Sequence, residues 1–323
     1  MAYAKAKSLT EDAIPVIDIS GLRDNSNAKG VAEQLHAASQ NLGFIYISGH
    51  GIPEEVIDAA RSSAYEFFRS DLAQKSSVKV SGQHRGWIGQ GGAKMQDDAK
   101  ADLKESYIWG IDYSKGDAPD DHALRGLNQW PDFMSHLQTR SMDYFSHAHA
   151  VAHHLMRGFA LGLGKPDNLF LRTATRPLSR ASYVYYPAQP DSAGEDQFGV
   201  GPHTDFGVLT VLCQDSVGGL QVQDINGEWI EAPPIPGTLV VNVADLLSRW
   251  TGGAYKSTPH RVVNASGRER LSLVLAFDPN PETMIDVGDV FDDPPEVAED
   301  PITCGDYLVW RFNKAFAYRS ANK

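Results

Sequence analysis

The chain has 323 residues, of which 42% are hydrophobic and 22% are charged; this composition is typical of a globular protein and excludes a disordered or fibrous one. Its 29 basic and 41 acidic residues give a formal net charge of −12, which argues against nucleic-acid binding. Its two cysteines form no metal-binding or disulfide motif, and no apolar run reaches the roughly 18 residues of a membrane span, so we expect a cytoplasmic protein without membrane contacts.

The first part of the chain combines short strands with amphipathic helices. Residues 14–19 (IPVIDI) and 44–48 (FIYIS) have the apolar, β-branched texture of strands. Between them, residues 28–42 carry apolar side chains at helical spacing, and Gly43 is a typical C-terminal stop. A further helix is expected over residues 53–69. The sequence therefore predicts a mixed α/β region at the start.

The second part changes from a long helix to many short strands. Residues 131–163 carry an apolar stripe at three- and four-residue steps, which predicts a helix that packs against a sheet. After Pro177, short β-rich runs alternate with turn residues, which favours a sandwich, barrel or jelly roll. The expected strands cover residues 181–186, 208–214, 220–223, 238–243, 260–264 and 271–277. In addition, residues 224–227 (DING) predict a hairpin turn, and residues 303–319 a capping helix.

We expect a single α+β fold with a mainly β core and flanking helices. Its expected parts are an N-terminal α/β region (1–120), supporting helices (121–175), a β-rich core (176–280) and a capping tail (281–323). We find no internal repeat and no low-complexity linker in the sequence.

Three side chains have the chemistry of a metal site. His203 and Asp205 lie two residues apart in GPHTDFG, so both project from one face of an extended segment. His260 begins a predicted strand 55 residues later, and strands distant in sequence are neighbours in a jelly roll. Two imidazoles and one carboxylate leave open positions that suit iron(II), whereas structural zinc has a closed shell, usually with thiolates. The three residues are therefore candidate iron ligands and catalytic residues.

A carboxylate-binding pair follows on the next strand. Arg270 and Ser272 alternate onto one face of RLSLVLAF, whose leucines occupy the other face. An arginine fork with a hydroxyl group is suited to a buried carboxylate. This pair predicts an anchor for an acidic cosubstrate.

The sequence resembles the isopenicillin N synthase-like branch of the iron(II)/2-oxoglutarate dioxygenases along most of its length. The segments that carry the resemblance are PVIDIS, GFIYISGHGI, RGWIGQGG, LKESYIWG, YYP, HTDFGVLTVL, GGLQVQDINGEWIEAPPIPGTLVVNVAD, STPHRVVN and RERLSLVLAFDPN. The resemblance implies a double-stranded β-helix, or jelly roll, that oxidises a small organic molecule. It also implies iron(II), 2-oxoglutarate and O₂ as cofactor and cosubstrates, with ascorbate as a further candidate.

By analogy with the family, the three candidate metal ligands hold iron, and Arg270 with Ser272 binds the distal carboxylate of 2-oxoglutarate. Tyr186, just before a proline, matches a position that often helps to hold that carboxylate or the substrate. One departure from the family is Ala244, where many members have glycine before an aspartate. It concerns local turn geometry and touches no ligand.

Two alternatives remain open from the sequence. One is an iron-dependent oxidase of the same fold that does not use 2-oxoglutarate, because some relatives use the same Arg–Ser pair for another carboxylate. The other is a catalytically silent sensor of a small carboxylate, against which the intact triad speaks. The sequence also leaves open the prime substrate, hydroxylation versus desaturation or cyclisation, and a monomeric or homodimeric state.

Residues 83–92 (QHRGWIGQGG) form a glycine-rich segment. The segment lacks the lysine followed by Ser or Thr of a phosphate-binding loop, so phosphate binding is not expected. We expect it to line the substrate entrance, with Arg85 and Trp87 as substrate contacts.

Three other polar groups are interpreted as structural. His149 and His153 are four residues apart on the long helix but lie away from its apolar stripe and lack the Glu of HExxH, which predicts a solvated face. His50 in SGHGI is expected to be a turn residue. The acidic residues 291–300 lack the spacing and glycine of a calcium loop and predict a solvated loop.

Overall fold

The computed structural model describes residues 6–7, 14–92, 102–113, 122–189, 198–264, 266–293 and 299–320. Its helices are α1 (Ser20–Arg23), α2 (Ala28–Asn41), α3 (Glu54–Arg69), α4 (Leu72–Ser76), α5 (His136–Gly162), α6 (Asp245–Trp250), α7 (Cys304–Ala315) and α8 (Ala317–Ser320). Its strands are β1 (Val16–Asp18), β2 (Phe44–Ser48), β3 (Gly86–Ile88), β4 (Glu105–Gly110), β5 (Arg180–Tyr186), β6 (Val200–His203), β7 (Leu209–Gln214), β8 (Leu220–Gln223), β9 (Trp229–Glu231), β10 (Leu239–Val243), β11 (His260–Val262), β12 (Arg270–Phe277), β13 (Met284–Ile285) and β14 (Ile302–Thr303).

The strands form two principal sheets. The eight-stranded sheet has the order β1-β2-β10-β7-β12-β5-β4-β3, the four-stranded sheet has the order β6-β11-β8-β9, and β13 pairs with β14. In the principal sheets β1 is parallel to β2, whereas the central pairs such as β12 with β5 and β7 are antiparallel. Side chains from both sheets line one cavity between them. The α+β fold with a jelly-roll core is therefore confirmed.

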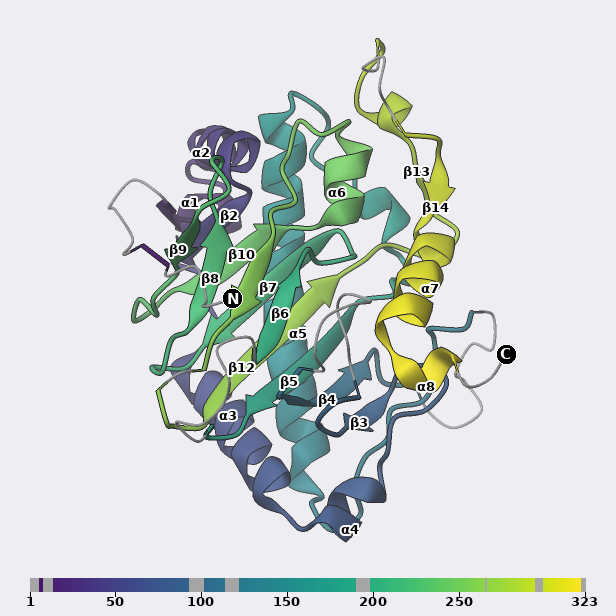
Figure 1. Ribbon diagram of the computed structural model, residues 1–323. Helices are drawn as coiled ribbons and strands as arrows, with labels where there is room; N and C mark the ends of the chain where they lie inside the picture. Colours follow the sequence, from purple (N-terminus) through teal and green to yellow (C-terminus); the bar gives the residue numbers. More distant parts are fainter. Residues whose placement is uncertain are drawn as a thin grey trace.

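Helices cover the outer face of the eight-stranded sheet (Figure 1). Helix α5 packs against β7 and β12, and α2 and α3 pack on α5 in turn. The apolar stripe predicted for this helix is buried, and its members are Leu137, Tyr144, Ala148, Val151, Leu155 and Phe159. Because α5 is anchored along its length, it is a firm support for the sheet that carries one wall of the cavity.

Strand β12 directs its side chains alternately to the two faces of the large sheet. On the helix side it buries Leu271, Leu273, Leu275 and Phe277 in the main core, and on the other side Arg270, Ser272, Val274 and Ala276 line the cavity. The register is set by pairing with β5 on one edge and β7 on the other. A slip by one residue would place the polar pair in the leucine core, so hydrophobic burial enforces the observed orientation.

Several elements were not expected from the sequence. Strand β4 is buried at every position, so it lacks the alternation by which a half-buried strand is found. Its first residue, Glu105, is an acid, but Lys75 Nζ lies 2.8 Å from its carboxylate and Trp87 Nε1 donates to it at 2.7 Å. Strands β3 and β9 have three residues each, which is too short for a periodic pattern.

The predicted hairpin turn at residues 224–227 joins β8 to β9. Gly227 has a φ of 79°, a conformation that favours glycine. The Asp224 carboxylate accepts hydrogen bonds from the backbone N–H groups of Asn226 and Glu228, both at 2.8 Å. The turn prediction is confirmed, and the side chain of its first residue stabilises it.

The C-terminal segment is helical, as expected, but it is broken into α7 and α8 at Phe316. Helix α7 contacts β14, next to which it is drawn in Figure 1, and adds Phe312 to the cavity wall. Of the acidic stretch 291–300, residues 294–298 lie outside the described residues. Within the described ranges, none of the helices has the length and apolar character needed to cross a membrane.

Candidate active site

The cavity between the two sheets has a volume of about 200 Å³. The large sheet contributes side chains from β2, β4, β5, β7, β10 and β12, and the small sheet contributes side chains from β6, β8 and β11. The polar side chains proposed from the sequence as iron and carboxylate ligands all line it, namely Tyr186, His203, Asp205, His260, Arg270 and Ser272. Residues that are far apart in the sequence thus meet in one cavity.

The two histidines are brought together by strand pairing. His203 on β6 and His260 on β11 are directly paired in register, and their ring centroids are 4.3 Å apart. Asp205 follows β6, and its Oδ1 lies 3.7 Å from His203 Nε2 and 3.8 Å from His260 Nε2. Ligand atoms of the three residues lie within 4.8 Å of one another. These donors therefore converge on one point that an ion could occupy.

Backbone carbonyl groups orient both imidazoles. His203 Nδ1 donates to the Gly201 carbonyl at 2.8 Å, and His260 Nδ1 donates to the Thr258 carbonyl at 3.2 Å. A neutral imidazole with its proton on Nδ1 presents the Nε2 lone pair, which is the form that binds a metal. Burial, followed by the nearby His260, lowers the pKa of His203 and favours that neutral form.

Hydrogen bonds from neighbouring side chains hold the carboxylate of Asp205. Asn242 Nδ2 on β10 donates to Asp205 Oδ2 at 2.8 Å, and Thr210 also hydrogen-bonds this carboxylate. Burial alone would raise the pKa of Asp205, but the two histidines and these hydrogen bonds lower it by more. Asp205 is therefore ionised, with Oδ1 left to face the histidines.

The Asn242→Ala variant is expected to weaken iron(II) binding about 10- to 100-fold, because partners of a metal ligand typically contribute this much. The overall fold should remain, since the removed group is a single side-chain amide. Iron(II) titration under anaerobic conditions measures the change, and circular dichroism checks the fold. Wild-type affinity in a folded variant would show that Asn242 does not orient Asp205.

Arg270 is fully buried, yet part of its guanidinium has no protein partner. Its Nε donates to the Gly218 carbonyl at 2.6 Å, and its Nη1 donates to Ser272 Oγ at 2.7 Å. Its Nη2 has no hydrogen-bond partner in the described part of the chain. The Tyr186 ring lies against the guanidinium, with 4.7 Å from its centroid to Arg270 Cζ. A buried cation with a free donor in a cavity is suited to an anionic ligand.

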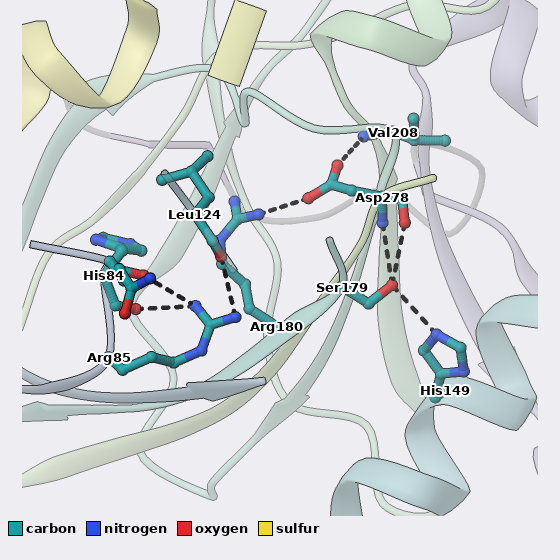
Figure 2. Close-up of polar contacts among 9 residues, drawn as sticks. His84, Arg85, Leu124, His149, Ser179, Arg180, Val208 and Asp278 are labelled. Atoms are coloured by element: carbon teal, nitrogen blue, oxygen red, sulfur yellow. Dashed lines mark hydrogen bonds and ion pairs between the residues drawn. The ribbon is translucent and has the colours of Figure 1, made fainter. Parts of the chain in front are cut away.

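Arg85 and Trp87 do not line the cavity. Arg85 is 3% exposed and donates to the backbone carbonyls of His84 and Leu124 at 3.1 and 3.2 Å (Figure 2). Trp87 is bound to Glu105 through its indole N–H. Their placement therefore argues against the predicted substrate contacts, whereas His84, from the same segment, does line the cavity.

The histidines of α5 are partly buried, so the predicted solvated face is wrong. His149 stacks on Phe145, and its Nε2 lies 3.1 Å from Ser179 Oγ. Burial, followed by the neighbouring His153, lowers the pKa of His149 to about 4. Both histidines contact Phe277, at centroid distances of 5.3 and 5.4 Å. Their role is packing between α5 and the sheet.

His50 is a turn residue, as expected: its Nδ1 accepts a hydrogen bond from the Ile52 backbone N–H at 3.1 Å.

Several cavity residues were missed from the sequence. The most prominent are His84, Lys104, Arg180, Phe206, Thr210 and Asn242. Arg180 had a readable signal, because counting back in twos from Tyr186 along β5 places it on the cavity face. Lys104 and His84 had no such signal, since they lie in loops.

Two family models match the chain. The model described as "non-haem dioxygenase in morphine synthesis N-terminal" matches residues 14–133, and the "2OG-Fe(II) oxygenase superfamily" model matches residues 176–279. A probable iron/ascorbate oxidoreductase of Dictyostelium discoideum is 35% identical over 86% of this chain and 84% of the relative. A homoarginine-6-hydroxylase of Glycine max is 33% identical over 85% of this chain and 88% of the relative.

Solved structures show the same relationship. A full-length protein of Neurospora crassa, solved in complex with alpha-KG and thymine, has a TM-score of 0.83 and 28% identity, with 95% of this chain and 98% of that chain covered. A 2OG-Fe(II) oxygenase family protein of Caulobacter crescentus has a TM-score of 0.80 and 27% identity, with 94% and 99% covered. The chain therefore belongs to the 2OG-Fe(II) oxygenase superfamily, in its isopenicillin N synthase-like family, and is a non-haem iron(II)- and 2-oxoglutarate-dependent dioxygenase that oxidises a small organic molecule.

Proposed function

We propose that His203, Asp205 and His260 are the iron(II) ligands of this dioxygenase. The support is the donor set itself, in which two imidazoles and one ionised carboxylate converge and leave the remaining side open to the cavity. This is the arrangement that non-haem iron(II) oxygenases use. When bound, the iron would activate oxygen for the oxidative decarboxylation of 2-oxoglutarate to succinate and CO₂.

Arg270 and Ser272 are the proposed anchor for the distal carboxylate of 2-oxoglutarate. The observation that carries this proposal is the buried Arg270 Nη2, which has no partner among the described residues although it lies in the wall of the metal-facing cavity. A carboxylate at that point would complete the arginine fork and accept from the Ser272 hydroxyl group. Tyr186, stacked on the guanidinium, would limit its movement.

The remaining contribution of the protein is orientation and exclusion of water. The Nδ1–H groups of both histidines and the Asn242 amide fix the three donors before any ligand arrives. Val200, Leu220 and Val262 give the cavity an apolar wall on the small-sheet side. These features keep a bound cosubstrate in one geometry and away from bulk water.

The proposal is tested by measuring whether succinate formation is coupled to formation of the oxidised product. Anaerobic protein is loaded with iron(II) and 2-oxoglutarate, exposed to O₂ with a metabolite mixture, and assayed for oxygen uptake, succinate and oxidised product. We expect one succinate for each product molecule. Oxygen uptake with product but without succinate would support the iron-dependent oxidase that the sequence left open and would contradict the assignment of Arg270 and Ser272 to 2-oxoglutarate.

We also propose a cytoplasmic enzyme with a small-molecule substrate and no nucleic-acid partner. Cys213 and Cys304 are both buried and unpaired, as expected in a reducing compartment, and the net charge of −12 opposes binding to nucleic acid. Fractionation of the source cells tests the location, since recovery of the protein in an oxidising compartment would contradict it.

A further inference from the structure

The cavity carries two cationic side chains besides the proposed 2-oxoglutarate anchor. Lys104 and Arg180 both line it, whereas Asp205 is the only acidic residue of its wall within the described ranges. Lys104 Nζ lies 3.4 Å from Asp102 Oδ2, and Arg180 pairs with Asp278, but neither of these acids lines the cavity. The two cations therefore face the interior while their carboxylate partners lie behind the wall.

Arg180 lies at the other end of the cavity from Arg270. In the pairing of β5 with β12, Arg270 is opposite Tyr186, and Arg180 is opposite Ala276. Six residues of strand separate these pairs, which corresponds to about 20 Å at a rise of about 3.4 Å per residue. With 2-oxoglutarate at Arg270, as proposed above, Arg180 is left to meet the prime substrate.

The Arg180 guanidinium is fixed in place before a substrate binds. Figure 2 shows it turned toward Asp278, whose carboxylate is fully buried and accepts from the Val208 backbone N–H at 3.0 Å. The ring of Phe312 on α7 supports the guanidinium at 4.7 Å from its centroid. The side chain is 15% exposed, so the fork is accessible from the cavity yet largely removed from solvent. Such a preorganised fork is suited to a planar anion.

Aromatic side chains surround this end of the cavity. His84 has a φ of 61°, an unusual conformation for a non-glycine residue, and its ring packs on Phe312 and Phe316 at 4.5 and 4.7 Å. Burial, followed by the charge of Arg180, lowers the pKa of His84 well below its usual value, so this histidine is neutral. Phe206 adds a further ring 6.0 Å from Phe312. This end therefore combines a fixed cation with flat apolar surfaces.

We propose that Arg180 binds a carboxylate of the prime substrate, which is thus an organic anion whose apolar body lies against Phe206 and Phe312. The inference rests on the function proposed above, because it assigns the Arg270 end to 2-oxoglutarate. Asp278 is a positioning residue, since it holds Arg180 and the backbone of Val208 without reaching the cavity.

The placement of the charges, with the two cations in the cavity wall and their acids behind it, supports an anion over a cation. Iron(II), ionised Asp205, dianionic 2-oxoglutarate and Arg270 together carry no net charge. A substrate with a cationic side chain would then meet Lys104 and Arg180 directly, with their compensating acids on the far side of the wall. A carboxylate would instead add a second acceptor to a guanidinium that is already oriented.

Calorimetry with matched probes tests the proposal. Anaerobic enzyme loaded with iron(II) and 2-oxoglutarate is titrated with indole-3-acetate, phenylacetate and benzoate, and with the corresponding carboxamides. We expect at least one carboxylate to bind about tenfold or more tightly than its amide, as for a charge-assisted hydrogen bond. The Arg180→Gln variant should lose this preference, and Arg180→Lys should keep part of it, because it retains the charge but not the fork.

The matched control is Arg61→Gln. Arg61 is also a partly buried arginine paired with one aspartate, at 3.1 Å from Asp58, but it lies outside the cavity. Its variant should keep the carboxylate preference. Equal binding of acids and amides to wild-type enzyme, failure of every acid to bind, or retention of the preference in Arg180→Gln would overturn the proposal. The affinity for 2-oxoglutarate is measured separately in each protein, so a failed cosubstrate site is distinguished from a failed Arg180 site.

Discussion

Replacement of Asp205 by alanine is expected to abolish turnover and to weaken iron(II) binding by more than about 100-fold. Loss of a hydrogen-bond partner of a metal ligand typically costs about 10- to 100-fold, and loss of the only anionic ligand removes a direct bond and a charge. His203 and His260 would remain paired across β6 and β11, but two imidazoles alone would face the ion, without a carboxylate. Anaerobic iron(II) titration and succinate formation measure the two effects.

His149→Ala is the matched control for this variant. His149 is a partly buried histidine on α5, and its Nε2 is hydrogen-bonded to Ser179 rather than turned to the triad. The control should lose stability through packing but keep wild-type iron stoichiometry and affinity. If Asp205→Ala still bound one iron with wild-type affinity, the assignment of the metal site would be wrong.

The three proposed iron ligands could be predicted from the sequence because short-range patterns identify them. The sequence shows directly that Asp205 follows His203 by two residues and that His260 begins a predicted strand. Metal chemistry restricts which ions such a set of side chains can bind. The exact pairing of His203 with His260 was not readable, because it depends on the register of β6 against β11. Likewise, Asn242 reaches Asp205 only because β10 lies beside β7 in the sheet.

The secondary structure shows the same difference between features that follow from local sequence pattern and features that depend on tertiary contacts. Strand β12 was predicted almost to the residue, since its leucines recur at every second position. Strand β4 was missed because it is buried on both faces, so apolar and polar residues do not alternate along it. Its first residue, Glu105, pairs with Lys75, which lies 30 residues earlier in the sequence. The end of the cavity that carries Arg180 and His84 also depends on contacts between residues that are far apart in the sequence. Arg180 is oriented by Asp278, 98 residues later, and His84 is packed by α7. Local pattern therefore identifies the reaction machinery, whereas tertiary contacts define the substrate pocket.

Replacement of Arg270 by alanine is expected to raise the Kd for 2-oxoglutarate by roughly two to three and a half orders of magnitude. Removal of one partner of a buried ion pair costs about 3–5 kcal/mol, and about 1.4 kcal/mol corresponds to a tenfold change in affinity. Iron(II) binding should be preserved, because Arg270 hydrogen-bonds Gly218 and Ser272 and none of the triad. Calorimetry measures both affinities on the same protein.

Ser272→Ala and Arg270→Lys complete the comparison. Loss of the Ser272 hydroxyl group removes one hydrogen bond, so a loss of about 1 kcal/mol, or roughly fivefold, is expected. Lysine keeps the charge but cannot form the fork, so its affinity should lie between those of the wild type and the alanine variant. Thermal unfolding adds an independent readout, since saturating 2-oxoglutarate should raise the Tm of the wild type but not that of Arg270→Ala. An undiminished Tm increase in Arg270→Ala would mean that 2-oxoglutarate is held elsewhere, and the end of the cavity opposite Arg180 would then need a different ligand.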